Sequence, residues 1–137
     1  MTAGGSGYTR VALADLPTLP DGEAVWAPVR HALDIESFGV NAFTAARSGG
    51  IVIEDHDESD SRHEELYVVL SGRAEFTIGD ESFEAPAGSL VAVRDPDLRR
   101  VARAAQAQTT VLAVGGVVGG AFEPREWEAR GAEALRS

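Results

Sequence analysis

The sequence predicts an all-β protein, a sandwich or barrel of about eight to ten short strands followed by one short C-terminal helix. Two observations lead to this class. Short segments rich in Val, Ile, Phe and Thr recur along the chain, and Gly, Pro or Asp separates them about every 8–12 residues. Only residues 123–135 favour a helix, because Pro124 suits a first turn and the acidic residues around it suit the positive end of a helix.

The elements can be placed in order along the chain. Residues 1–7 are small and Gly-rich, so we expect a flexible N-terminal tip ahead of a single domain over residues 8–137. Residues 25–35 are mixed in character, and Pro28 argues against a central strand there. Gly79 and Asp80 predict a hairpin turn. The expected strands cover residues 8–16, 38–46, 51–56, 65–72, 73–80, 81–88, 89–97, 99–105 and 108–116.

Composition narrows the classes of function. The 137 residues carry 12 basic and 22 acidic side chains, and the net charge of −10 argues against nucleic acid and anionic membranes as partners, because phosphates attract basic surfaces. The chain has no cysteine, which excludes disulfides, thiolate metal sites and cysteine nucleophiles. The start of the chain lacks the pattern of a secretion signal, and no apolar run approaches the ~20 residues of a membrane span. We therefore expect a cytoplasmic protein.

One short stretch concentrates the polar chemistry. Residues 54–65, "EDHDESDSRHEE", hold seven acidic residues and two of the chain's three histidines. If residues 59–62 form a four-residue hairpin loop, Glu58 lies opposite His63 and His56 lies opposite Glu65. Opposed residues in paired strands share a face, so we expect these four side chains to point the same way.

Such a grid of imidazoles and carboxylates suits two kinds of chemistry. His56, Glu58, His63 and Glu65 could hold a divalent ion of Fe, Mn, Ni or Zn. Alternatively, the carboxylates raise the pKa of a histidine, which then works as a general acid or base. The other acids of the stretch are expected to be solvated turn residues: Asp55, Asp57, Asp60 and Glu64.

The residues around this stretch resemble the first motif of the cupin superfamily. That motif reads Gly, five residues, His-x-His, three or four residues, Glu, six residues and Gly. Gly50, His56, Glu65 and Gly72 take these places here, with Glu58 at the second histidine and a spacer longer by two or three residues.

The second cupin motif is also recognisable, with one important change. It reads Gly, about five residues, Pro-x-Gly, two residues, His, three residues and Asn. Gly79, Pro86 and Gly88 fall at matching places, and Val91 stands where the family has its histidine ligand. Together the two resemblances cover residues 50–95.

An alternative register of the first motif keeps the glutamate and the final glycine but shortens the spacer. The two family histidines then fall on Ser59 and Ser61, and His63 resembles the histidine that often lies two residues before the glutamate. The first register is preferred because it keeps the spacing from Gly50 to His56 and agrees with the hairpin pairing.

The resemblance implies a cupin-type jelly-roll barrel, a site inside it that takes a small-molecule ligand, and commonly a homodimer. The leading hypothesis is an enzyme, either an acid–base isomerase, cyclase, lyase, dehydratase or epimerase, or a metal-dependent oxygenase. The competing hypothesis is a non-catalytic module that binds or senses a small molecule or sugar, and a ligand-free structural relic is a third. The candidate catalytic residues are His56, Glu65 and Tyr67, and the candidates for ligand contact are Glu58, His63, Val91 and Phe76.

Four arginines follow the second motif in an otherwise acidic chain. Alternation along a strand places Arg99 and Arg103 on one face and Arg100 on the other. One of the four, which include Arg94, could bind an anionic ligand, although pairing with surface acids is the preferred interpretation.

The remaining features predict structure more than chemistry. His31 has no visible partner and is interpreted as a structural or surface residue. Trp26 and Phe43 are expected to pack inside the barrel. Residues 115–120, "GGVVGG", match a phosphate loop in glycine count only and are interpreted as a flexible strand exit.

Overall fold

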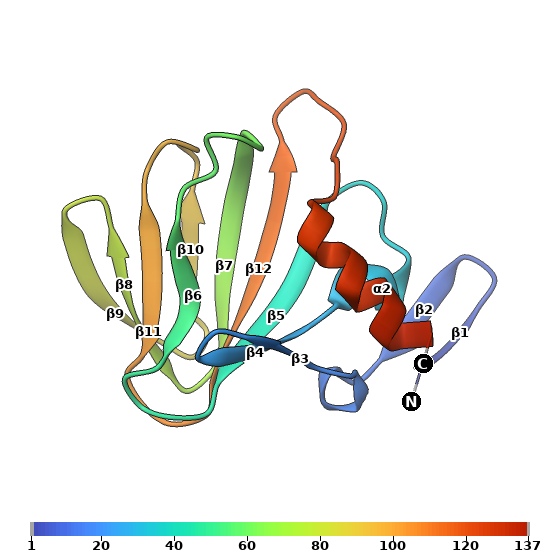
Figure 1. Ribbon diagram of the computed structural model, residues 1–137, viewed down its shortest axis with the longest axis horizontal. Coiled ribbons are helices and arrows are strands. Elements are labelled where there is room, and N and C mark those ends of the chain that lie inside the picture. Colours follow the sequence, from blue (N-terminus) through green and yellow to red (C-terminus); the bar gives the residue numbers. More distant parts are fainter. Residues whose placement is uncertain (1, 137) are drawn as a thin grey trace.

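The fold consists of two larger antiparallel sheets that face one another and a separate N-terminal hairpin (Figure 1). The computed structural model describes residues 2–136. The six-stranded sheet has the order β10-β7-β12-β5-β4-β3 and the four-stranded sheet has the order β6-β11-β8-β9. The prediction of an all-β barrel with a short C-terminal helix is confirmed.

The elements have the following bounds. The six-stranded sheet contains β3 (Leu19–Asp21), β4 (Ala24–Ala27), β5 (Gly39–Ala45), β7 (His63–Ser71), β10 (Leu90–Val93) and β12 (Thr109–Val117). The four-stranded sheet contains β6 (Ile51–His56), β8 (Arg73–Ile78), β9 (Glu81–Pro86) and β11 (Arg100–Ala104). The remaining elements are β1 (Thr2–Gly5), β2 (Tyr8–Val11), the 3-10 turns η1 (Leu13–Asp15) and η2 (Glu126–Glu128), and the helices α1 (Val29–Leu33) and α2 (Ala129–Arg136).

Two segments differ from their expected structure. Residues 2–5 of the expected flexible tip form strand β1, which pairs with β2. Pro28 itself lies in no strand and is the N-cap of helix α1, but the residues just before it form β4, which lies between β5 and β3 in the six-stranded sheet. The predicted hairpin between β8 and β9 is confirmed, and Gly79 turns there with a φ of 58°.

The predicted hairpin between the strands that flank the acidic turn is wrong. β6 pairs with β11 in the four-stranded sheet, whereas β7 pairs with β10 and β12 in the six-stranded sheet. The chain therefore crosses from one sheet to the other at residues 57–62. Loop length alone made a direct hairpin plausible, but the competing partners of both strands lie far away in the sequence.

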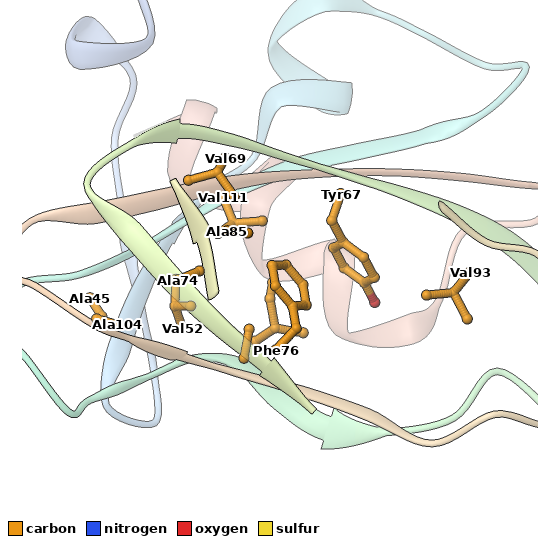
Figure 2. Close-up of a cluster of buried hydrophobic side chains, with 12 residues drawn as sticks. Ala45, Val52, Tyr67, Val69, Ala74, Phe76, Ala85, Val93, Ala104 and Val111 are labelled. Carbon is orange, nitrogen blue, oxygen red and sulfur yellow. The ribbon is translucent and has the colours of Figure 1, made fainter. Parts of the chain in front are cut away.

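The main core lies between the two sheets. It is built from buried residues of both sheets, among them Val52, Tyr67, Phe76 and Val111. Figure 2 shows this cluster, with the Tyr67 ring beside that of Phe76 at a centroid distance of 5.7 Å. Tyr67 therefore belongs to the core by its ring, while its hydroxyl group is free to reach a polar neighbour.

A second, smaller core covers the outer side of β5 and β12. Val40 and Ala42 of β5 pack there against Val29 of α1 and Leu16. The outer side of β7 and β10 is more open to solvent, since Leu70 and Leu90 are 45% and 70% exposed there. The expected homodimer stays a prediction. Within residues 2–136, no helix has the length and apolar character that crossing a membrane requires.

Candidate functional site

A chamber of about 390 Å³ lies at one end of the space between the sheets. Its lining comes from β5, β6, β7 and β12 and from the segment after β12, here called the C-terminal wall, which contributes Phe122, Arg125, Trp127, Glu128 and Arg130. Figure 1 shows this segment leading from the end of β12 to α2. The chamber brings the polar stretch together with distant parts of the chain. Its lining includes Asn41, Phe43, His56, Glu58, His63, Glu65, Tyr67, Gly115, Phe122, Trp127 and Glu128.

His56 and two glutamates form the polar centre of the chamber. His56 Nε2 lies 2.8 Å from Glu58 Oε2 and 3.5 Å from Glu65 Oε1. On the other side of the ring, Nδ1 donates a hydrogen bond of 2.7 Å to the carbonyl oxygen of Glu54. The predicted meeting of His56 with Glu65 is thus present, although the two residues come from facing sheets and not from one ladder.

The charges of this centre fix its protonation. Partial burial lowers the pKa of His56, but the hydrogen bonds to Glu58, Glu65 and the Glu54 carbonyl outweigh it and raise that pKa to about 10. Burial acts to raise the pKa of Glu58, and the hydrogen bonds from His56 and Ser61 more than reverse this, so the pKa of Glu58 is lowered. At neutral pH the pair is an imidazolium facing a carboxylate.

Tyr67 joins the centre through Glu65. Its hydroxyl group donates a short hydrogen bond to Glu65 Oε1. Burial, followed by the negative charge of Glu65, raises the pKa of Tyr67 well above its ordinary value, so the phenol keeps its proton. Phe76, a predicted ligand contact, supports Tyr67 from within the core and is not among the residues that line the chamber.

Arg100 is buried in the barrel, whereas the sequence favours pairing of this arginine with surface acids. Its side chain has no solvent exposure, and Nη1 donates to Glu65 Oε1 over 2.9 Å. In β11 it lies opposite His56 of β6. The alternation that set Arg100 apart from Arg99 and Arg103 was the signal for an inward side chain. Arg99 behaves as expected, since it pairs with Asp55 at 2.9 Å on the surface.

His63 lies deeper than its place beside the turn suggested. Only 7% of the residue is exposed, and Nδ1 lies 3.5 Å from Glu58 Oε1. The ring of Phe122 stacks on the His63 ring with a centroid distance of 5.3 Å. Phe122 fits because Gly39 faces it, where a Cβ atom would come within 2.9 Å of the ring.

A second polar cluster holds the C-terminal wall of the chamber. Glu128, which is 4% exposed, accepts a hydrogen bond of 2.8 Å from Arg30 Nε and one of 3.2 Å from Asn41 Nδ2. His31 Nε2 lies 3.8 Å from Glu128, so this histidine has a partner 97 residues away that no local pattern predicted. The buried Oδ1 of Asn41 has no hydrogen-bond partner.

The other predicted residues lie outside the centre or at its mouth. Val91 pairs with Tyr67 in the sheet and packs on the main core, so it is not a chamber residue. Asp57 and Asp60 line the mouth of the chamber, whereas Asp55 and Glu64 are exposed, as expected. Residues 115–117 belong to β12, which corrects their assignment to a flexible exit.

The donor atoms permit a test of the metal hypothesis. His56, Glu58 and Glu65 each offer one atom within 4.8 Å of the others, a spacing that could hold a metal ion. However, Glu65 Oε1 already accepts hydrogen bonds from both Tyr67 and Arg100, and His63 is not part of the triad. The position of the fourth family ligand is the apolar Val91. A buried guanidinium on one of these three donors is a poor fit for a resident metal.

Comparisons with solved structures show the fold. No protein-family model and no curated protein sequence matches this chain. A cupin protein from Bacteroides fragilis is 21% identical, with a TM-score of 0.64 over 90% of this chain and 94% of that one. A predicted oxalate decarboxylase from Thermotoga maritima is 14% identical, with a TM-score of 0.64 over 79% and 98%. A sugar phosphate isomerase from Silicibacter pomeroyi is 16% identical, with a TM-score of 0.62 over 78% and 74%.

Proposed function

From the cupin fold of this chain, we propose that the chamber is the active site of a small-molecule enzyme in which His56 gives a proton and Glu58 takes one. The reaction class is proton transfer without a metal ion, such as an isomerisation, epimerisation or dehydration. The observation that carries this proposal is the contact of 2.8 Å between His56 Nε2 and Glu58 Oε2, two residues that line the chamber.

The roles follow from the hydrogen bonds of the pair. The Glu54 carbonyl holds the ring of His56 in one orientation, which directs Nε2–H toward the two carboxylates. His56 is 32% exposed on its side chain, so a ligand in the chamber can reach the ring. The raised pKa of His56 and the lowered pKa of Glu58 set the protonation states that the two roles need at neutral pH: an imidazolium that can give a proton and a carboxylate that can take one. Glu65 accepts hydrogen bonds from Tyr67 and Arg100, and its carboxylate lies beside His56.

The charge of the lining bears on the ligand. Seven carboxylate side chains line the chamber against two arginines, so a neutral or cationic ligand is favoured over an anion. The unpartnered Oδ1 of Asn41 is a buried acceptor in this lining, which suits a hydroxyl or amino group of a ligand. We therefore propose a small polyhydroxyl or amino compound as the ligand class. The acids are Asp21, Glu54, Asp57, Glu58, Asp60, Glu65 and Glu128, and the arginines are Arg125 and Arg130.

A binding module without catalysis is the second candidate. It is favoured because the polar groups of the centre already have partners within the protein. His56 shares its proton with Glu58, and Glu65 accepts hydrogen bonds from two donors. In this case a ligand would fill the chamber without exchanging a proton. The difference between the two candidates is therefore measurable as exchange of ligand hydrogen with solvent.

The test uses deuterium exchange. A panel of neutral sugars and amino sugars is incubated with the protein in D2O, and loss of a C–H signal is followed by proton NMR. The enzyme proposal expects exchange at one carbon, slowed by at least about 100-fold in His56→Gln and unchanged in the exposed neighbour Asp55→Asn. Binding without exchange supports the module. Exchange that persists in His56→Gln, or a panel that neither binds nor exchanges, contradicts the proposed enzyme.

Ligand charge has its own test. Glucosamine, glucose and glucuronate share one pyranose ring and carry a positive, zero and negative charge. Saturation-transfer NMR is expected to rank the cation and the neutral sugar above the anion. The opposite ranking would contradict the proposed ligand class.

A further inference from the structure

The polar centre combines a metal-like donor triad with a buried cation. His56, Glu58 and Glu65 present three donor atoms at a spacing that suits a divalent ion. Arg100 places a guanidinium nitrogen 2.9 Å from Glu65, the same residue that would complete the triad. A bound metal ion and the Arg100 guanidinium would therefore compete for the same Glu65 carboxylate.

Arg100 cannot leave this place by swinging into solvent. Its side chain has no exposed surface, and its position in β11 lies between β6 and β8, opposite His56 on one side and Ile78 on the other. Nη2 donates to the carbonyl oxygen of Asp95 at 3.2 Å, which anchors the other end of the guanidinium. The guanidinium is therefore a fixed part of the centre.

One oxygen of Glu65 carries all the competing contacts. Tyr67 and Arg100 both donate to Oε1, and Oε1 is also the atom 3.5 Å from His56 Nε2. A carboxylate oxygen has two lone-pair sites, and both are used. A metal ion on this oxygen would displace one donor and lie close to a shielded positive charge, where repulsion is weakly screened.

We infer that Arg100 is the resident cation of the centre and that its guanidinium keeps divalent metal ions out of a site whose remaining donors would otherwise bind one. The inference goes beyond the proposed function, because metal uptake is measured without any substrate. Arg100 acts here as a positioning residue, since it reaches the chamber only through Glu65.

The inference predicts a gain of function by substitution. Arg100→His removes the fixed charge and brings an imidazole to the strand position opposite His56. This variant is expected to bind one equivalent of Zn²⁺ or Ni²⁺, at least about 10- to 100-fold more tightly than the unchanged protein. The matched control, Arg100→Lys, keeps a positive charge at the same position and is expected to bind no better than the unchanged protein.

The measurement is equilibrium dialysis of tag-free protein against Zn²⁺, Ni²⁺ or Mn²⁺, with the bound metal counted by mass spectrometry. Circular dichroism shows that each variant is folded. Loss of the acquired metal in the double variant Arg100→His with His56→Ala would show that it sits at this centre. If Arg100→His does not fold, Arg100→Gln replaces it, because Gln removes the charge and keeps a polar side chain.

Three results would overturn the inference. The first is one equivalent of metal in the unchanged protein that His56→Ala abolishes. The second is no gain of metal in a folded Arg100→His or Arg100→Gln variant. The third is equal uptake by Arg100→Lys and Arg100→His, because charge would then not be the cause.

Discussion

The guanidinium of Arg100 lies 2.9 Å from the carboxylate of Glu65, and no part of the Arg100 side chain is exposed to solvent. The two residues come from different sheets, β11 and β7, so their contact joins the two halves of the barrel. A buried ion pair of this kind need not stabilise a fold relative to apolar residues, but the loss of one partner is costly because the other charge stays buried.

Glu65→Gln should therefore destabilise the protein by about 3 kcal/mol. The neutral amide leaves the Arg100 charge without its partner, and Nε of Arg100 already lacks one. The free energy of unfolding is measured by urea titration. The exposed neighbour Glu64→Gln is the control and should change stability by less than about 0.5 kcal/mol. Equal stability of the two variants would mean that the ion pair contributes little.

Tyr67→Phe isolates the hydrogen bond from the packing. The ring keeps its contact with Phe76, while Glu65 loses one of its two donors. We expect a loss of about 1.5 kcal/mol in the free energy of unfolding, the typical worth of a hydrogen bond to a charged group. Tyr8 is the chain's other tyrosine and is 61% exposed, so Tyr8→Phe provides the control with no expected change. A Tyr67→Phe variant as stable as the control would argue against this hydrogen bond.

The strands were predictable because their signals are local. Alternating apolar residues and glycine turns fixed β8 and β9 and the hairpin between them, and the cupin resemblance supplied the arrangement into a barrel. The pairing of β6 and β7 was not predictable from loop length, because each strand gains more contacts from partners far along the chain. His56 and Glu65 still meet, since both face the interior of the same barrel.

The candidate site was predictable where the chemistry lay in one stretch and not where it depended on distant residues. His56, Glu58 and Glu65 stood close together in the sequence, and so their grouping was visible. The partnership of Glu128 with Arg30 joins residues 98 positions apart, and no local pattern announces it. Arg100 falls between these cases, because its alternation was readable but its burial was not.

The protonation of His56 gives stability a characteristic dependence on pH. The pKa of about 10 in the folded protein lies above the ordinary value of 6.5. The favourable contribution is therefore fully present below about pH 6.5 and is lost as pH rises through about 10. The difference in urea midpoint between the unchanged protein and His56→Gln should shrink over this range.

The same urea titrations at low pH measure the contribution of Glu58 to stability. Its pKa is lowered in the folded protein, so its contribution is present above the ordinary value of 4.5 and is lost as pH falls below it.

Proton NMR of the imidazole resolves His56 directly and should show it protonated at pH values where an ordinary histidine is neutral. A neutral His56 ring at slightly alkaline pH would contradict this account of the centre.

Glu128 should control the docking of the C-terminal wall. Its carboxylate is the buried partner of Arg30 and Asn41, and the helix that follows packs so closely that a Cβ atom at Gly131 would lie 2.6 Å from Pro28. Glu128→Gln leaves the Arg30 charge unpaired, with an expected loss of about 3 kcal/mol, whereas the exposed Glu126→Gln should have little effect. Replacing both Arg30 and Glu128 by Met should recover most of the loss, because no buried charge remains.

Tryptophan emission gives the readout, since both tryptophans of the chain, Trp26 and Trp127, meet at this seam with ring centroids 5.0 Å apart. A red shift in Glu128→Gln at denaturant concentrations where the sheets stay folded is the expected result, and identical emission from Glu126→Gln and Glu128→Gln would show that the wall docks without this ion pair.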